Sequence, residues 1–172
     1  HTQPLSASTL GTDVTDFADR VEDGDWHPAV MAALAEMPSG GAVVFPAGQY
    51  RFDQPIELRG QVALLLAPGA RLVTGAQDLI RIVGDGDITI RGVGGRPELA
   101  NTATELERDE RGVPAETVTS VISLNHVPMD ARPSLRVEGV TLTGFVCIEG
   151  MRVEEKGPMG ALEVLDCHFQ AE

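Results

Sequence analysis

Short apolar segments, each ended by Gly or Pro after a few residues, constrain the fold of this chain more than any other feature. The clearest example runs from Gly40 to Phe52. It has a glycine pair, the apolar stretch Val43–Phe45, a Pro-x-Gly turn and a second stretch that carries Tyr50. Strands of three or four residues are unstable alone, so these segments must join a larger sheet. The links between them are too short to hold crossover helices, which favours strands that turn corners and stack on the preceding coil.

The same pattern continues along the chain and includes a weak internal repeat. Further candidate strands, separated by Gly or Pro turns, are 55–58, 62–66, 70–73, 79–82, 88–90 and 118–124. The segments that begin at Asp87, Ser134 and Ala161 each read apolar–polar–apolar, then a short turn, then a similar second half. The last two copies are 27 residues apart, a spacing typical of solenoid repeats. The first two are 47 apart, which leaves room for an extra coil or an insertion.

One amphipathic helix is predicted before the first strand. Apolar residues recur at three- and four-residue intervals from Trp26 to Met37, Asp25 is a suitable N-cap, and Pro28 falls in the first turn. We expect this helix to cover the first coil, whose strand edges would otherwise be open. The predicted organisation is an arm over 1–22 with a short strand at 14–17, a capping helix within 23–39, and coils over 40–172 with a charged inserted loop at about 94–117.

Charge and composition argue against several classes of protein. The net charge is −13, with twelve Arg and one Lys, whereas non-specific nucleic-acid binding depends on a basic surface. No apolar run approaches the roughly 20 residues of a membrane span, so no membrane partner is predicted. We expect a secreted, extracellular or cell-surface protein. Cys147 and Cys167 are 20 residues apart and could stack on neighbouring coils, but two buried thiols are favoured.

Three segments carry a resemblance to a known family. They are Asp-Gly-Asp, the helix and Gly-Gly-x-Val-x-Phe-Pro-x-Gly-x-Tyr at Asp23–Tyr50, Pro-x-x-Leu and Leu-x-x-Pro-Gly-Ala at Pro55–Ala70, and Val-x-x-Cys-x-Phe at Val164–Phe169. Together they resemble the amino-terminal portion of the pectate lyase superfamily. The resemblance implies an all-β fold, a right-handed parallel β-helix (solenoid) with an N-terminal amphipathic capping helix. It also implies lysis, hydrolysis or epimerisation of polysaccharides, or a tail-spike or adhesion role.

The chain departs from active members of that family in its catalytic motifs. It has no Asn-Thr-Asp, Asp-Asp pair or Gly-His-Gly of the polygalacturonase type, and no Arg-x-Pro-x-x-Arg of the pectate lyase type. In the family the active site usually lies on middle coils, whereas this sequence stops at Glu172, directly after a predicted rung. We therefore expect the front end of a longer β-helix, whose catalytic coils are missing or come from another chain.

Candidate catalytic residues come from the last coil. Cleavage of a polysaccharide needs two carboxylates beside the glycosidic bond, or a base with a charge-neutralising cation. Asp166 and His168 are two residues apart and are predicted to project to the same face. Arg152 or Arg136, on a neighbouring coil, would then complete a base and an anion clamp. The same spacing is also typical of any half-exposed strand, where every second residue is polar.

Carboxylates elsewhere suggest a cation site. Asp85 and Asp87 flank a glycine in a turn and are candidate ligands for Ca²⁺, which prefers oxygen. No EF-hand or repeated nonapeptide pattern surrounds them, and Asp and Gly are also favoured in ordinary turns. Glu149, Glu154 and Glu155 form either a second group of carboxylates or a solvated face. No other cofactor is indicated.

Two functions are consistent with these features. The first is a polysaccharide-active β-helix protein, or part of one, with lyase or glycoside hydrolase activity. The missing motifs leave open whether this chain is itself an enzyme. The second is a non-catalytic module for carbohydrate binding, adhesion or assembly. In both cases the expected partner is a polysaccharide or oligosaccharide. The last coil would expose strand edges and apolar side chains, so self-association or a second chain is predicted at the C-terminal end.

Overall fold

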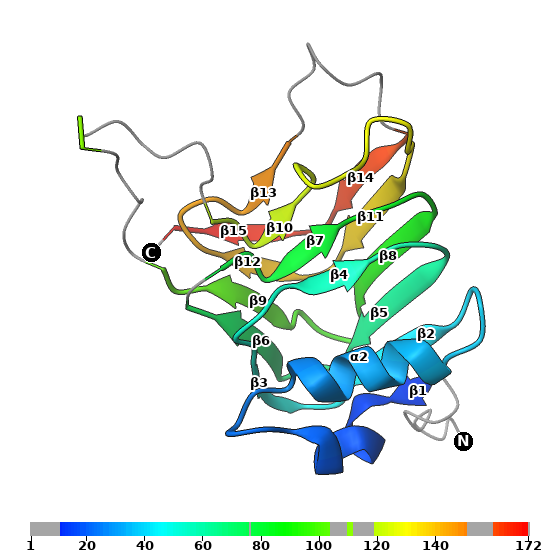
Figure 1. Cartoon of the computed structure of the whole chain (residues 1–172). Coiled ribbons are helices and arrows are strands. Elements are labelled where there is room, and N and C mark those ends of the chain that lie inside the picture. The colour runs from blue at the N-terminus through cyan, green and yellow to red at the C-terminus, as the bar shows by residue number, and fades with distance from the viewer. Residues whose placement is uncertain (1–10, 76, 104–109, 112–118, 151–159, 172) are drawn as a thin grey trace.

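Three parallel β-sheets dominate the computed structural model, which describes residues 11–75, 77–103, 110–111, 119–150 and 160–171 (Figure 1). Sheet A contains, in spatial order, β1 (Thr12–Asp13), β2 (Ala42–Phe45), β5 (Val62–Leu66), β8 (Asp87–Gly92), β11 (Ser134–Glu138) and β14 (Leu162–Leu165). Sheet B contains β3 (Gly48–Arg51), β6 (Ala70–Thr74), β9 (Glu98–Asn101), β12 (Thr141–Thr143) and β15 (His168–Gln170). Sheet C contains β4 (Ile56–Leu58), β7 (Ile80–Ile82), β10 (Ile122–Ser123) and β13 (Ile148–Glu149). The predicted all-β class is confirmed.

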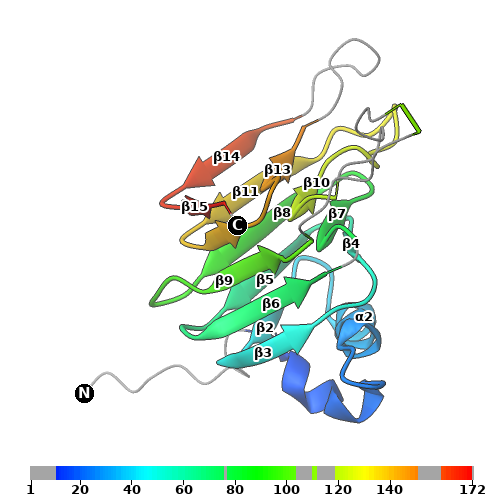
Figure 2. The same ribbon diagram turned by 90° about the vertical axis from the view of Figure 1, so that its left-hand side faces the viewer.

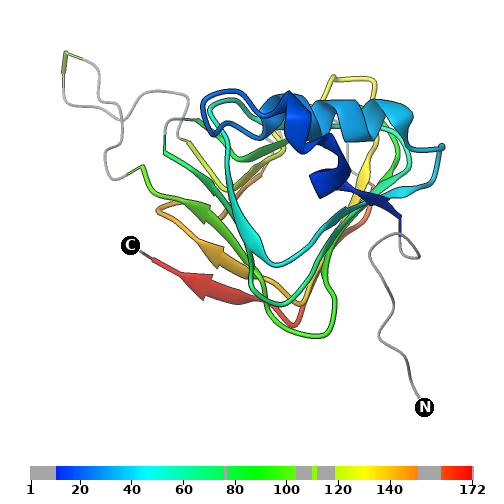
Figure 3. The ribbon, with the colours of Figure 1, turned by 90° about the horizontal axis from the view of Figure 1, so that it is seen from below.

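The chain visits the three sheets in rotation, and we call one passage through A, B and C a circuit. Each strand pairs in parallel with the equivalent strand of the circuit before it, so the circuits are stacked (Figure 2). Seen from below, the three sheets surround one common interior (Figure 3). The repeat that begins at Asp87, Ser134 and Ala161 is confirmed by the register. Ile88 lies beside Leu135, and Leu135 lies beside Leu162.

The 47-residue interval in that repeat is an insertion. It holds no extra circuit, because β8 and β11 are direct neighbours in sheet A. The predicted bounds of the inserted loop, 94–117, begin too early, since Glu98–Asn101 is the strand β9 and pairs with both β6 and β12. Arg96, Pro97 and Glu98 hid this strand, because they interrupt the apolar alternation. Residues 104–109 and 112–118 lie outside the described part of the chain.

The core lies between the sheets and is built from alternate residues of most strands, while β2 and β9 bury consecutive residues. Phe45, Leu64 and Ile90 from sheet A, Leu72 from sheet B and Ile80 from sheet C have no exposed surface. Burying an aliphatic or aromatic side chain of this size contributes about 1.5–3 kcal/mol. The residues between them face outward and are mostly polar, so alternation fixes both the register and the orientation of each strand.

Two helices in the described regions lie at the N-terminal end of the stack. The predicted amphipathic helix is α2 (His27–Glu36), which packs against β2, β4 and the 3₁₀-helix η1 (Val14–Arg20). It buries Ala29, Val30 and Ala33. The N-cap residue is Trp26, one position after the predicted Asp25, but Oδ1 of Asp25 still accepts a hydrogen bond of 2.9 Å from the backbone N–H of His27. Neither of these helices is long and apolar enough to cross a membrane.

The strand predicted at 14–17 is wrong. Thr12–Asp13 forms the short strand β1 beside β2, and residues 14–20 then turn into η1. The cause is local. The Asp13 carboxylate accepts hydrogen bonds from the backbone N–H and the hydroxyl of Thr15, at 2.8 and 2.6 Å, and so starts a helical turn.

Candidate functional site

A row of polar side chains runs across the outer face of sheet C. Glu57, Arg81, Ser123 and Glu149 occupy matching positions on β4, β7, β10 and β13. Their neighbours Ile56, Ile80 and Ile122 are buried on the inner face. Adjacent positions in such a row are about 4.8 Å apart, so groups from four circuits lie side by side, although Ser123 among them has no exposed surface.

Asp78, just before β7, is the most connected polar residue beside this row. Its side chain is 6 % exposed. Oδ1 accepts hydrogen bonds from the backbone N–H and the hydroxyl of Ser120, at 2.7 and 3.2 Å. Oδ2 accepts a hydrogen bond of 2.8 Å from Nε of Arg81 and lies 3.8 Å from Nε2 of His126. One carboxylate therefore ties together two neighbouring circuits and the residues that follow β10.

Glu149 is the group on this surface whose acidity is most changed. Partial burial raises the pKa of its carboxyl group, a hydrogen bond with Asn125 lowers it, and the charge of Asp78 raises it again. The balance is upward, so Glu149 keeps its proton to a higher pH than an exposed glutamate. We call Asp78, Arg81, Asn125, His126 and Glu149 the sheet C cluster.

The sheet C cluster combines groups suited to acid–base chemistry. Glu149 can donate a proton when it is protonated, and its raised pKa widens the pH range over which it can do so. The His126 side chain is 40 % exposed and can accept or donate a proton at the surface. Asp78 itself has little free surface, and its described partners occupy both oxygens. Its role here is therefore to hold Arg81 in position and to place negative charge near Glu149.

The predicted catalytic residues lie away from this surface. Asp166 is in the turn after β14, where its Oδ1 accepts a hydrogen bond of 2.7 Å from Nη2 of Arg96. His168 is on the outer face of sheet B, in register with Thr141. No interaction joins Asp166 to His168 in the part of the chain described. Arg152 falls outside that part.

Arg136, the alternative cation for that site, is on the outer face of sheet A. Its Nε lies 3.4 Å from Oε2 of Glu138, and its Nη1 lies 3.9 Å from Oε2 of Glu163. These contacts hold it along the strands of sheet A. The structure does not bring it together with His168, which lies on sheet B.

The carboxylates predicted to bind Ca²⁺ each have a protein partner. Oδ1 of Asp85 accepts a hydrogen bond from the backbone N–H of Arg132, and Oδ2 of Asp87 accepts one of 3.4 Å from Nε2 of Gln61. The described residues contain no group of three or more His, Cys, Asp or Glu suited to a metal ion. Calcium binding at Asp85 and Asp87 stays a prediction, and Glu154 and Glu155 lie outside the described ranges.

The two cysteines are free and do not stack on each other. Cys147 follows β12, and its thiol donates to the backbone oxygen of Leu142 at 3.4 Å. Cys167 follows β14, and its thiol donates to the backbone oxygen of Val137 at 3.5 Å. The two residues lie at different corners of their circuits, B to C and A to B. The 20-residue spacing therefore places them on neighbouring circuits but not beside each other.

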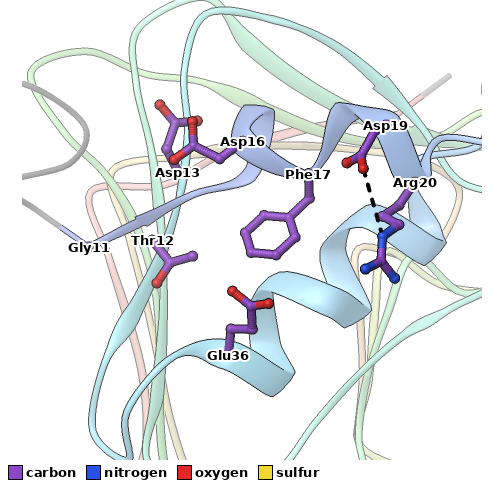
Figure 4. A pocket seen from close by; sticks show the side chains of 8 residues that line it. All are labelled: Gly11, Thr12, Asp13, Asp16, Phe17, Asp19, Arg20 and Glu36. Atoms are coloured by element: carbon purple, nitrogen blue, oxygen red, sulfur yellow. Dashed lines mark ion pairs between the residues drawn. The ribbon is translucent and has the colours of Figure 1, made fainter.

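A separate pocket of about 450 Å³ lies beside the N-terminal elements (Figure 4). Its lining is mainly acidic and consists of Gly11, Thr12, Asp13, Asp16, Phe17, Asp19, Arg20 and Glu36. Figure 4 shows the carboxylates of Asp13, Asp16 and Glu36 around the ring of Phe17. This charge would repel an anionic ligand. Residues 1–10, which directly precede the pocket, are outside the described ranges, so no functional site is assigned to it.

Comparison of the chain with models of protein families, with curated proteins and with solved structures found no match. The choice of a functional surface therefore rests on geometry and chemistry. The sheet C cluster is preferred because it joins a carboxyl group of raised pKa, a second carboxylate, an arginine and an exposed histidine.

Proposed function

We propose that the chain is a right-handed parallel β-helix protein of the pectate lyase-like type and that it acts on a carbohydrate polymer. Two observations support the fold part of the proposal. The strands rotate through three parallel sheets, and equivalent residues of successive circuits are in register. We also propose an extracellular or cell-surface location, where structural polysaccharides are found.

The sheet C cluster is the proposed site of cleavage, and the observation that carries this assignment is that Asp78 brings Arg81 and the exposed His126 together beside Glu149, whose pKa is raised. In hydrolysis, Glu149 donates its proton to the glycosidic oxygen as the bond to the leaving sugar breaks. His126, exposed beside Asp78, takes a proton from the attacking water. Glu57 and Arg81, which share the outward row, give the sugar chain polar contacts beside the cluster, whereas Ser123 in the same row has no exposed surface.

An activity assay with a matched pair of variants tests this proposal. The protein is incubated with a panel of neutral and uronate polysaccharides, and new reducing ends and unsaturated products are measured. Glu149→Gln removes the proton donor, and we expect it to lower the rate by about 10²–10⁴-fold. Glu163→Gln, on the exposed outer face of sheet A, should leave the rate unchanged. If no substrate in the panel gives either product, the assignment of an enzyme is wrong.

A second function, carbohydrate binding without cleavage, is favoured by the engagement of Asp78. Its side chain is 6 % exposed, and its hydrogen bonds to Ser120 and Arg81 hold neighbouring circuits together. A carboxylate used in this way need not react. Affinity electrophoresis separates the two functions. A binding module is slowed by a polysaccharide in the gel but releases no product from it, whereas an enzyme shortens the polymer.

A further inference from the structure

The arginines on sheet C are matched by carboxylates of the same surface. Nε of Arg81, on β7, donates a hydrogen bond of 2.8 Å to Oδ2 of Asp78. Nη2 of Arg59, directly after β4, lies 3.8 Å from Oε2 of Glu57. In the part of the chain that the structure describes, no other Arg or Lys lies on the four strands of sheet C or next to one of them. This part of the sheet therefore carries no excess of positive charge.

One more arginine lies near the corner between sheets C and A. Nη1 of Arg132 donates hydrogen bonds of 3.1 and 3.0 Å to the backbone oxygens of Met129 and Ala131. The backbone N–H of Arg132 donates to Oδ1 of Asp85, so a carboxylate lies beside this residue as well. Arg132 therefore does not change the balance of charge on sheet C.

The excess of charge on this surface is negative. Glu149 is hydrogen-bonded to the neutral amide of Asn125 and lies in the field of Asp78. The whole chain has a net charge of −13. Such a field repels a polyanion over about one Debye length, roughly 10 Å at 0.1 M salt. A polymer with a carboxylate on each sugar is therefore disfavoured both during its approach and on the surface itself.

We propose that the sheet C cluster binds an uncharged polysaccharide in preference to a uronate polymer, an inference that rests on the proposed function of this surface. A uronate carboxylate would compete with Asp78 for Arg81. Because the Asp78 side chain is 6 % exposed, loss of that partner would leave a buried charge unpaired, which is costly. A sugar hydroxyl causes no such loss. It can accept a hydrogen bond from an N–H group of Arg81 that Asp78 does not use, and it can donate one to Glu57.

A cationic polymer of amino sugars is disfavoured by the same pairs. The net charge would attract it to the molecule as a whole. On sheet C, however, Asp78 and Glu57 already face arginines, which leaves Glu149 as the carboxylate without a described cationic partner. The attraction is therefore long-range and is removed by salt.

Binding of the whole chain to immobilised polymers tests the substrate class separately from cleavage. Biolayer interferometry is run with a neutral glucan, mannan or xylan, with polygalacturonate and with chitosan, at low salt and at about 0.15 M NaCl. The Kd for the neutral polymer should change by less than about twofold between the two salt concentrations. At the higher one, polygalacturonate and chitosan should bind at least about tenfold more weakly, with or without CaCl₂.

A matched pair of charge reversals locates the effect on sheet C. Glu57→Lys removes the partner of Arg59 and reverses a charge on this surface, so polygalacturonate should bind at least about threefold more tightly. Glu163→Lys makes the same change of charge on the outer face of sheet A and should leave that Kd unchanged. The two glutamate side chains are similarly exposed, at 48 % and 53 %. Circular dichroism checks that both variants fold, and the comparison of polymers on the unmodified chain decides the question if one does not.

The outcomes separate this inference from the proposed function. Polygalacturonate or chitosan that binds as tightly as the neutral polymer at about 0.15 M NaCl would overturn the substrate class. An equal gain in both variants would also overturn it, because net charge alone would then explain the binding. If a neutral polymer binds but releases no reducing ends, the substrate class stands and the assignment of cleavage is wrong. If no polymer binds, both are wrong.

Discussion

Asp166 has the left-handed backbone conformation that Gly139 has in the equivalent turn one circuit earlier. The φ angles are 49° and 66°, and the strands before and after the two turns are paired in register. Glycine adopts this conformation freely, and aspartate tolerates it better than most residues. The requirement therefore comes from the shape of the corner between sheets A and B. At Asp166 the chain meets it with a residue that can also bind Arg96.

The effect of substituting Asp166 on the free energy of unfolding should depend on how readily the new residue adopts the left-handed conformation. We expect Asp166→Val to lower the free energy of unfolding by about 1–2 kcal/mol, because a β-branched residue is strained in the left-handed region. Asp166→Gly should cost less, although both variants lose the hydrogen bond to Arg96. Urea unfolding measures the difference. The control is Gln170→Val, at an exposed strand position where valine is favoured, and a cost there equal to that of Asp166→Val would contradict the argument.

Tyr50 should titrate at unusually high pH. Burial raises the pKa of its phenol to about 12, and the charge of Asp13 adds to the shift. Because Tyr50 is the single tyrosine, the ultraviolet absorbance of tyrosinate reports it alone. The folded state holds the proton more tightly than the unfolded state. The resulting stabilisation is complete below about pH 10 and is lost as the pH rises towards 12. A transition near the ordinary pKa of tyrosine in the folded protein would show that the phenol is not buried.

The hydroxyl group of Tyr50 also has a measurable structural role. It donates a hydrogen bond of 2.7 Å to the backbone oxygen of Pro46. The ring of Tyr50 packs edge-on against the ring of Trp26, with 4.9 Å between the ring centroids. Tyr50→Phe keeps the ring and removes the bond, so we expect a loss of about 1 kcal/mol in the free energy of unfolding. The tyrosinate absorbance transition should disappear in this variant.

Asp78 should be one of the most sensitive polar residues of the chain. Asp78→Asn removes the charge that faces Arg81 and one acceptor used by Ser120, and we expect a loss of about 2–3 kcal/mol. The matched control is Asp53→Asn, which breaks the exposed pair with Arg51 and should cost less than about 1 kcal/mol. Chemical denaturation of both variants measures the two costs. Equal costs would mean that Asp78 does not hold the circuits together.

Two valines in one column of sheet A offer a direct comparison of buried and exposed positions. Val137 has no exposed surface, and its register partner Val164 is 37 % exposed. We expect Val137→Ala to cost about 2 kcal/mol and Val164→Ala less than about 1 kcal/mol. Unfolding must be measured at low protein concentration, where copies do not associate. A larger cost at Val164 would show that its side chain is covered within the single chain.

Most of the fold was predictable because many of the strands alternate apolar and polar residues and the others are short apolar runs between turns. This alternation decides which side chains enter the core, so it also determined the register of the copies at 87, 134 and 161. The errors occurred where a local polar contact overrides the pattern. The side chain of Asp13 starts a helix where the apolar residues Val14 and Phe17 suggested a strand, and Arg96 and Glu98 disguised the start of β9.

The candidate site was less predictable because its residues are far apart in the sequence. Asp78 contacts Ser120 and lies near His126. In the sequence, the insertion separates Asp78 from both of these residues. Their proximity follows only when β10 is known to pair with β7. The sequence did contain one usable signal. With that register, Arg81 and Glu149 lie in one column of sheet C. Each strand of the sheet contributes one polar residue to this column.

The insertion between β9 and β10 leaves the stack undisturbed, and this has a consequence for engineering. Ile56, Ile80, Ile122 and Ile148 form one continuous column, although residues 102–121 separate β9 from β10. The entropic cost of loop length grows slowly, by about 0.6 kcal/mol for each doubling. This corner is therefore the natural position at which to graft a foreign peptide or recognition loop. The sequence of the inserted loop can be changed there without changing the strands of the stack.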